Sequence, residues 1–116
     1  MSTALLTTNP ATGVWVATWG ALANAESGDA ATLPVENATR SVQITGTFGA
    51  AGNVIMEGSN DAVTWFPLSD GLATKGNLAT ITANGLNALY ENTRYVRPRV
   101  SAGDGTTNLK VVLVAV

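Results

Sequence analysis

Tyrosine and arginine side chains alternate along one segment of this chain of 116 residues. In an extended strand, Tyr95, Arg97 and Arg99 point to one face. Val96 and Val100 point to the other face, which we expect to contact the core. Tyrosine and arginine are enriched at the energetic centres of protein interfaces, and arginine binds carboxylates through paired hydrogen bonds. The spacing therefore predicts an interface strip of Tyr95, Arg97 and Arg99, unless both arginines pair with carboxylates of a neighbouring strand or only solubilise that face.

The tryptophans form a second candidate set. Trp15 and Trp19 lie four residues apart, so in an extended strand both indoles point to the same face. Together with Trp65 they could stack on sugar rings as a carbohydrate-binding platform. The alternative, which we favour, is that at least two of the three pack in the core or at a subunit contact, because an indole buries a large apolar area. Of the three tryptophans, we expect Trp15 and Trp19 to lie at a subunit contact, and we predict them as interface residues.

Residues that could perform catalysis are scarce. The chain has no cysteine and no histidine, which excludes thiolate nucleophiles, Cys/His zinc sites and histidine-based acid–base pairs. The carboxylates are scattered singly, whereas a glycosidase needs two that face each other roughly 5–10 Å apart. No glycine-rich phosphate-binding loop occurs. We therefore predict that the protein is not an enzyme and has no catalytic residue and no cofactor.

Three aspartates in turn-like sequences, Asp61, Asp70 and Asp104, could in principle hold calcium. None belongs to a spaced set of ligands such as an EF-hand loop. Aspartate side chains in turns commonly accept hydrogen bonds from nearby backbone N–H groups. We therefore expect all three to shape turns and predict no metal site.

Charged residues make up 12% of the chain, about half of the usual share of roughly 25%. A surface with so few charged residues is typical of one that is covered in an assembly. The alternative is that the surface is simply neutral and rich in alanine and threonine. The net charge of -2 argues against nucleic acid as a partner. The longest apolar stretch, 111–116, is far shorter than the roughly 20 residues that span a bilayer, so we expect no membrane partner. The first residues lack the features of an export signal, and we expect use without export.

The elements that position these residues are predicted to be strands. Val42, Ile44 and Phe48 alternate with polar residues, and Val54 and Met56 alternate with Ile55 and Glu57, the two-residue period of a strand. We expect the first three side chains to meet those of Val54 and Met56 in the core. A polar turn over 59–61 and a second strand over 64–68 then complete a hairpin.

The segment 83–91 is ambiguous. Leu86, Leu89 and Tyr90 have helical spacing, so a single helical turn competes with a strand. We favour an irregular crossover there. For the whole chain, about eight strands separated by short turns predict an all-β fold, a single-domain antiparallel β-sandwich or jelly roll. Residues 14–116 form the sandwich domain and residues 1–13 an N-terminal arm.

Four segments recur together in a known group of proteins. They are Thr18-Trp19 with the Gly/Ala/Asn-rich loop after it, RSVQITGTFG at 40–49, EGSND at 57–61 leading to Trp65, and ENTRYVRP at 91–98. Through these segments the chain resembles the small capsid-decoration (cement) proteins and other minor virion structural proteins of tailed bacteriophages. Similar proteins often have glycine after the EGSND turn and proline before the Arg–Tyr pair, where this chain has Ala62 and Thr93.

The resemblance implies a decoration protein that binds the outer capsid surface and stabilises contacts between capsomers. Its partners would be the major capsid protein and further copies of itself, as a trimer or otherwise a dimer. Its location would be the virion, assembled in the host cytoplasm. Two alternatives stay open, a tail or head–tail structural protein and a non-catalytic carbohydrate-binding module.

Overall fold

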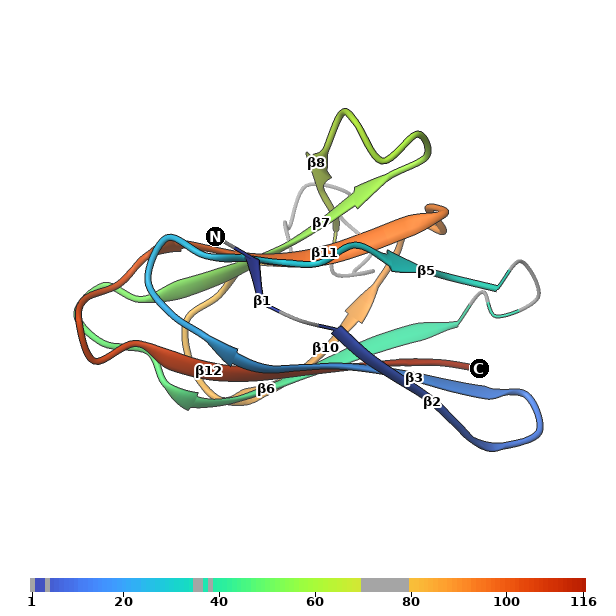
Figure 1. Cartoon of the computed structure of the whole chain (residues 1–116), viewed down its shortest axis with the longest axis horizontal. Coiled ribbons are helices and arrows are strands. Elements are labelled where there is room, and N and C mark those ends of the chain that lie inside the picture. The colour runs from blue at the N-terminus through green and yellow to red at the C-terminus, as the bar shows by residue number, and fades with distance from the viewer. Residues whose placement is uncertain (1, 4, 35–36, 38, 70–79) are drawn as a thin grey trace.

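A computed structural model of the chain describes residues 2–3, 5–34, 37, 39–69 and 80–116. Two β-sheets lie one above the other, and the described residues contain no helix (Figure 1). The pairings are antiparallel, except that the short β1 pairs parallel with β4. The predicted all-β, single-domain β-sandwich is therefore confirmed.

The upper sheet in Figure 1 has the strand order β1-β4-β11-β7-β8, with β5 also paired to β11 and β9 to β7. Its strands are β1 (Ser2–Thr3), β4 (Ser27–Gly28), β5 (Ala31–Thr32), β7 (Asn53–Ser59), β8 (Phe66–Pro67), β9 (Thr80–Ile81) and β11 (Tyr95–Ala102). The lower sheet has the order β10-β6-β12-β3-β2. Its strands are β2 (Leu5–Ala11), β3 (Val14–Leu22), β6 (Arg40–Thr47), β10 (Gly85–Leu89) and β12 (Asn108–Ala115). The described strands outnumber the expected eight because several of them have two residues each.

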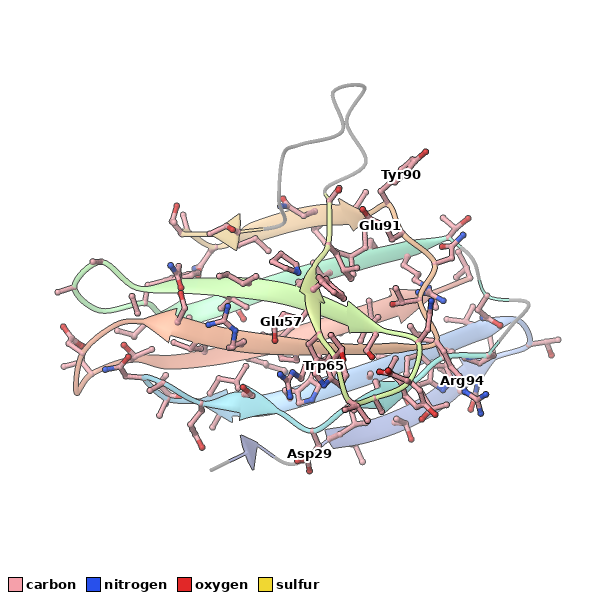
Figure 2. The ribbon with its side chains drawn as sticks, turned by 90° about the horizontal axis from the view of Figure 1, so that it is seen from above. Asp29, Glu57, Trp65, Tyr90, Glu91 and Arg94 are labelled. Atoms are coloured by element: carbon pink, nitrogen blue, oxygen red, sulfur yellow. The ribbon has the colours of Figure 1, made fainter. Side chains whose placement is uncertain are left out.

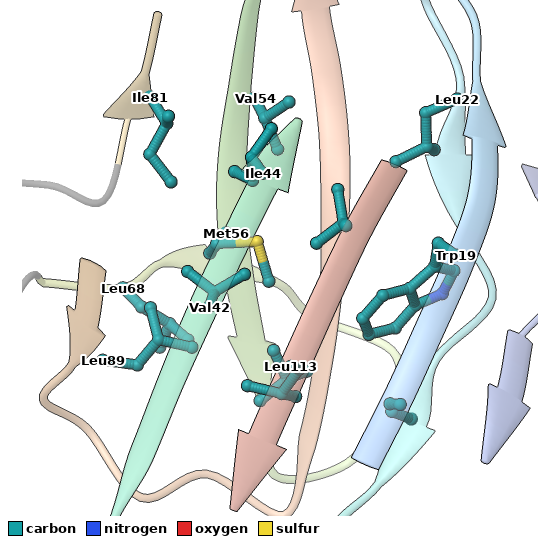
Figure 3. Close-up of a cluster of buried hydrophobic side chains, with 14 of the residues drawn as sticks. Trp19, Leu22, Val42, Ile44, Val54, Met56, Leu68, Ile81, Leu89 and Leu113 are labelled. Carbon is teal, nitrogen blue, oxygen red and sulfur yellow. The ribbon is translucent and has the colours of Figure 1, made fainter. Parts of the chain in front are cut away.

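The core lies between the sheets and follows the two-residue period of the strands (Figure 3). Val42 and Ile44 of β6 and Val54 and Met56 of β7 are each 0% exposed, as the alternation predicts. Phe48 is different. It follows the end of β6 at Thr47, beyond the regular alternation of the strand, and is only partly buried against the core.

The predicted irregular crossover over 83–91 is wrong for residues Gly85–Leu89, which form β10 and pair with β6. Leu86 and Leu89 are three residues apart, so in a strand they point to opposite faces. Leu89 is buried and Leu86 is exposed, in agreement with that geometry. The helical spacing of Leu86 and Leu89 in the sequence therefore does not reflect a helix, because one side chain is buried and the other is exposed.

The segment 1–13, expected to be an N-terminal arm, contributes β2 to the lower sheet. Residues Leu5–Ala11 pair with β3, and the pairing register shifts between Thr8 and Ala11. Because β2 pairs with β3 alone, it forms one edge of that sheet.

Candidate functional site

The outer face of the upper sheet carries the residues that the alternation of β11 predicts there. Tyr95, Arg97 and Arg99 are partly exposed, whereas Val96 and Val100 are buried against the core. Strand β7 lies beside β11, and its register places Glu57 directly opposite Arg97. Side chains that face each other across an antiparallel pair are close enough to interact.

Both arginines bind the same carboxylate. The Nε of Arg97 donates to Glu57 Oε1 at 3.1 Å, and the Nε of Arg99 donates to Glu57 Oε2 at 2.9 Å. The Glu57 side chain is 7% exposed, while those of Arg97 and Arg99 are 27% and 35% exposed. Pairing with a neighbouring-strand carboxylate, one of the alternatives for the strip, is therefore present. Among the described residues, the Nη groups of both arginines make no further hydrogen bond.

Trp65 covers the first of these arginines. The loop between β7 and β8 brings the indole to the outer face of the sheet, close to Glu57 in the view of Figure 2. The guanidinium carbon of Arg97 lies 4.2 Å from the centroid of the Trp65 ring, a cation–π contact. This contact and the bond to Glu57 fix the guanidinium of Arg97 in one orientation.

The turn that carries Trp65 is held by Asp61. Asp61 Oδ1 accepts hydrogen bonds from Ser59 Oγ at 2.9 Å, from Val63 N at 2.9 Å and from Thr64 N at 3.0 Å. These bonds, the Thr64 N–H first, lower the pKa of the Asp61 carboxyl. The next residue, Ala62, has a φ of 62°, in the left-handed region that favours glycine.

Tyr95 and Arg94 extend the same face toward the start of β11. The guanidinium carbon of Arg94 lies 5.4 Å from the centroid of the Tyr95 ring. We name the whole set the arginine cluster; it consists of Glu57, Trp65, Arg94, Tyr95, Arg97 and Arg99. The cluster holds three of the six basic residues of the chain and one carboxylate.

The structure places the two other predicted interface residues elsewhere. Trp15 and Trp19 are 8% and 0% exposed and belong to the core. The Nε1 of Trp19 donates to the backbone oxygen of Asp29 at 2.9 Å, which satisfies the polar atom of the buried indole. We therefore assign Trp15 and Trp19 to packing within the chain and not to an interface. A stacking platform of three tryptophans is absent, since Trp65 alone lies on the outer face.

Asp104 shapes a turn, as predicted. Its carboxylate accepts hydrogen bonds from Thr106 Oγ1 at 2.6 Å, from Thr106 N at 2.8 Å and from Ala50 N at 2.8 Å. In the part of the chain that the structure describes, no group of three or more possible metal ligands comes together. Asp70 lies outside the described residues.

A groove of about 380 Å³ opens beside the β7–β8 loop, a feature that sequence alone does not indicate. It is lined by Gly58, Ser59, Asn60, Asp61, Thr64, Phe66, Pro67, Leu68, Glu91 and Thr93. Its two carboxylates are engaged with the protein itself. Asp61 holds the turn, and Glu91 accepts hydrogen bonds from the backbone N and the Oγ of Ser69, both at 2.7 Å.

No protein-family model, no curated protein and no solved structure matches this chain. In the residues that the structure describes, no helix is long and apolar enough to cross a membrane.

Proposed function

We propose that this protein is a capsid-decoration protein of a tailed bacteriophage, which binds the outer capsid surface and stabilises contacts between neighbouring capsomers. The observation that carries the proposal is the arginine cluster, a fixed and outward-facing set of interface-type side chains. It stands on a chain with only 12% charged residues, so its charge contrasts with the rest of the molecule. Arginine, tyrosine and tryptophan are the residues most enriched at interface hot spots.

Apolar side chains next to the cluster support a protein-binding role. Val63 and Phe66 flank Trp65 in sequence and are 79% and 64% exposed. The loop that carries Val63 projects beyond the upper sheet in Figure 1. Apolar side chains that gather into an exposed patch mark surfaces that another molecule covers.

The mechanism is passive. Each copy buries part of its surface across a junction between capsid subunits, and many symmetry-related copies add their interface energies. Association of the copies as a trimer, or otherwise as a dimer, strengthens individually weak contacts through avidity. The rigid sandwich holds the contact residues in place, so less conformational entropy is lost on binding.

The carbohydrate-binding alternative has less support. It required exposed indoles, and Trp15 and Trp19 are buried in the core. The guanidinium of Arg97 lies over the ring of Trp65. No sugar can stack on that face of the indole while the arginine remains there.

The test is binding of the purified protein to capsid shells of the phage that encodes it, prepared without this protein. We expect saturable binding over the whole shell, in numbers comparable with the capsid subunits, and a higher temperature of shell disruption. The matched controls are the same shells with the Lys110→Gln variant, in which a basic residue outside the arginine cluster is changed. Binding to a single vertex would indicate a tail or head–tail role, and absence of binding would contradict the proposal.

A further inference from the structure

We infer that the arginine cluster binds an extended acidic segment of a partner protein, in which two carboxylates lie two residues apart. This inference rests on the proposed function, because it names the chemistry of the partner at the proposed contact face. It is carried by the charge of the cluster, by the donors of two arginines that no described residue engages, and by the spacing of these arginines along β11.

The first argument is charge. Arg94, Arg97 and Arg99 carry three positive charges, and Glu57 supplies one negative charge, whereas the whole chain has a net charge of -2. Among the described residues, Arg97 and Arg99 form ion pairs with Glu57 alone. The six residues of the cluster thus carry a positive charge in sum, on a protein that is acidic overall. Their guanidinium groups attract an anionic partner.

The second argument is the state of the guanidinium groups. Each uses its Nε for Glu57, and the Nη groups are not bonded to described residues. Guanidinium Nη groups form paired hydrogen bonds with carboxylates. Glu57 fixes both arginines, and Trp65 also fixes Arg97. A partner carboxylate therefore meets donors that are already oriented, which reduces the entropy lost on binding.

The third argument is spacing. The Cα atoms of Arg97 and Arg99, two residues apart on one strand, are roughly 6.5–7 Å apart along the strand axis, and the two guanidinium groups bind different oxygens of the Glu57 carboxylate. Carboxylates two residues apart on an extended partner segment have the same separation and point to one side. A segment with the pattern Glu-X-Glu or Asp-X-Asp can therefore place one carboxylate on each guanidinium.

Nucleic acid fits this face less well. A nucleic-acid site neutralises many phosphates, and its affinity grows with the number of basic contacts. Besides the three arginines of the cluster, the chain has three basic residues, Arg40, Lys75 and Lys110. Arg40 is buried, so it adds nothing to a basic surface. The few cations of the cluster suit a short acidic segment.

The experiment compares two short acetylated peptides, Ser-Glu-Thr-Glu-Ser and the same peptide with both glutamates replaced by glutamine. Binding to the whole protein is followed by NMR shifts of the side-chain N–H groups of Arg97, Arg99 and Trp65. We expect the glutamate peptide to bind at least about tenfold more tightly, since each hydrogen bond between charged groups contributes on that order. The preference should weaken as salt is added.

Two variants test whether the cluster is responsible. The triple variant Glu57→Gln, Arg97→Gln, Arg99→Gln removes the charges together, so no buried carboxylate is left unpaired, and it should lose the preference. The double variant Arg97→Lys, Arg99→Lys keeps the ion pairs and hence the fold, and it should weaken the preference by removing the paired Nη donors. The Lys110→Gln variant should bind like the wild type.

Equal binding of both peptides to the wild-type protein, or an unchanged preference in the double variant, overturns the inference. A short single-stranded DNA that binds more tightly than the glutamate peptide overturns it in favour of nucleic acid.

Binding to capsid shells distinguishes a failure of the inference from a failure of the proposed function. A protein that prefers the glutamate peptide but does not bind shells refutes the decoration role and leaves the acidic specificity of the cluster intact. Full shell binding by the double variant shows that a capsid contact lies elsewhere and overturns the inferred partner.

Discussion

Glu57 connects two strands and two arginines through one carboxylate that is almost inaccessible to water. Glu57→Gln removes the negative charge and leaves a single acceptor oxygen for two donors. We expect the free energy of unfolding to fall by about 1.5–3 kcal/mol, the range for hydrogen bonds to charged groups. The loss is smaller than for a fully buried ion pair, because the arginine side chains are 27% and 35% exposed and water can solvate them.

Urea denaturation at neutral pH measures this change. The matched control is Asp29→Asn, because the Asp29 carboxylate is exposed and forms no ion pair among the described residues. A fall in stability no larger than that of Asp29→Asn would show that the Glu57 carboxylate is not important for the fold.

The same geometry changes an expectation that the sequence alone suggests. Exposed ion pairs contribute about 0–1 kcal/mol, so Arg97→Glu together with Arg99→Glu would leave stability nearly unchanged if both arginines were only surface residues. The structure places the nearly buried Glu57 between them. Two added carboxylates would crowd around it, and like charges at that distance are destabilising. Sequence could locate the arginines on one face but could not show that they share one carboxylate.

Asp104 makes stability depend on pH at a second, separate place. The Thr106 hydroxyl, followed by the N–H groups of Ala50 and Thr106, holds the pKa of the Asp104 carboxyl below its ordinary value of 3.8. Because the pKa is lower in the folded state, the carboxylate stabilises the fold above the unfolded-state pKa. That contribution is lost as the pH falls through the folded-state pKa.

We therefore expect Asp104→Asn to be less stable than the wild type at neutral pH, and the difference to close as the pH falls below 3.8. Urea midpoints of both proteins, measured from neutral pH down to about pH 2, test the prediction. A difference that stays constant over this range would mean that the carboxylate is not the group responsible.

At the scale of the strands, the two-residue alternation of side chains predicted which residues of β6 and β7 face the core. It identified Val42, Ile44, Val54 and Met56 as core residues because β6 and β7 each present one face to the opposite sheet. It failed at β10, since pairing with β6 is a long-range contact that local spacing does not encode. The position of Trp65 was also beyond local pattern, because the turn after β7 determines where the indole lies.

Close packing between two strands of different sheets gives a further prediction. A Cβ atom added at Gly28 of β4 would lie 2.5 Å from Trp19 Cδ1 and 2.8 Å from Pro98 Cδ. Both neighbours are fully buried, so neither can move away freely. We expect Gly28→Ala to lower the free energy of unfolding by about 1–3 kcal/mol, the usual effect of overpacking.

Gly20→Ala is the matched control, because a Cβ atom at Gly20 of β3 has no neighbour within 4 Å. It should leave stability unchanged or raise it slightly, since alanine restricts the unfolded chain more than glycine does. Chemical denaturation of both variants gives the comparison. Equal stability of the two variants would contradict the packing of Gly28 against Trp19.

At the scale of the whole molecule, the C-terminal strands form the centre of both sheets. β12 lies between β6 and β3 in the lower sheet, and β11 lies beside β7 in the upper sheet. Trp15 pairs with Ala115, so the lower sheet joins residues from opposite ends of the sequence. Folds that depend on such distant pairings form slowly, typically in milliseconds to seconds.

This topology predicts a strong asymmetry between the two ends of the chain. Removal of residues 108–116 deletes a central strand and exposes the apolar partners of Leu109, Val111 and Leu113, each of which is 0% exposed. We expect that truncated protein to show no cooperative unfolding transition. Removal of residues 1–11 deletes the two-residue edge strand β1 and the edge strand β2, whose residues are mostly exposed, and should leave a folded protein of lower stability. Tryptophan fluorescence during urea denaturation distinguishes the cases, because Trp15 and Trp19 are buried only when the sheets are packed. A cooperative transition without residues 108–116 would contradict the central position of β12.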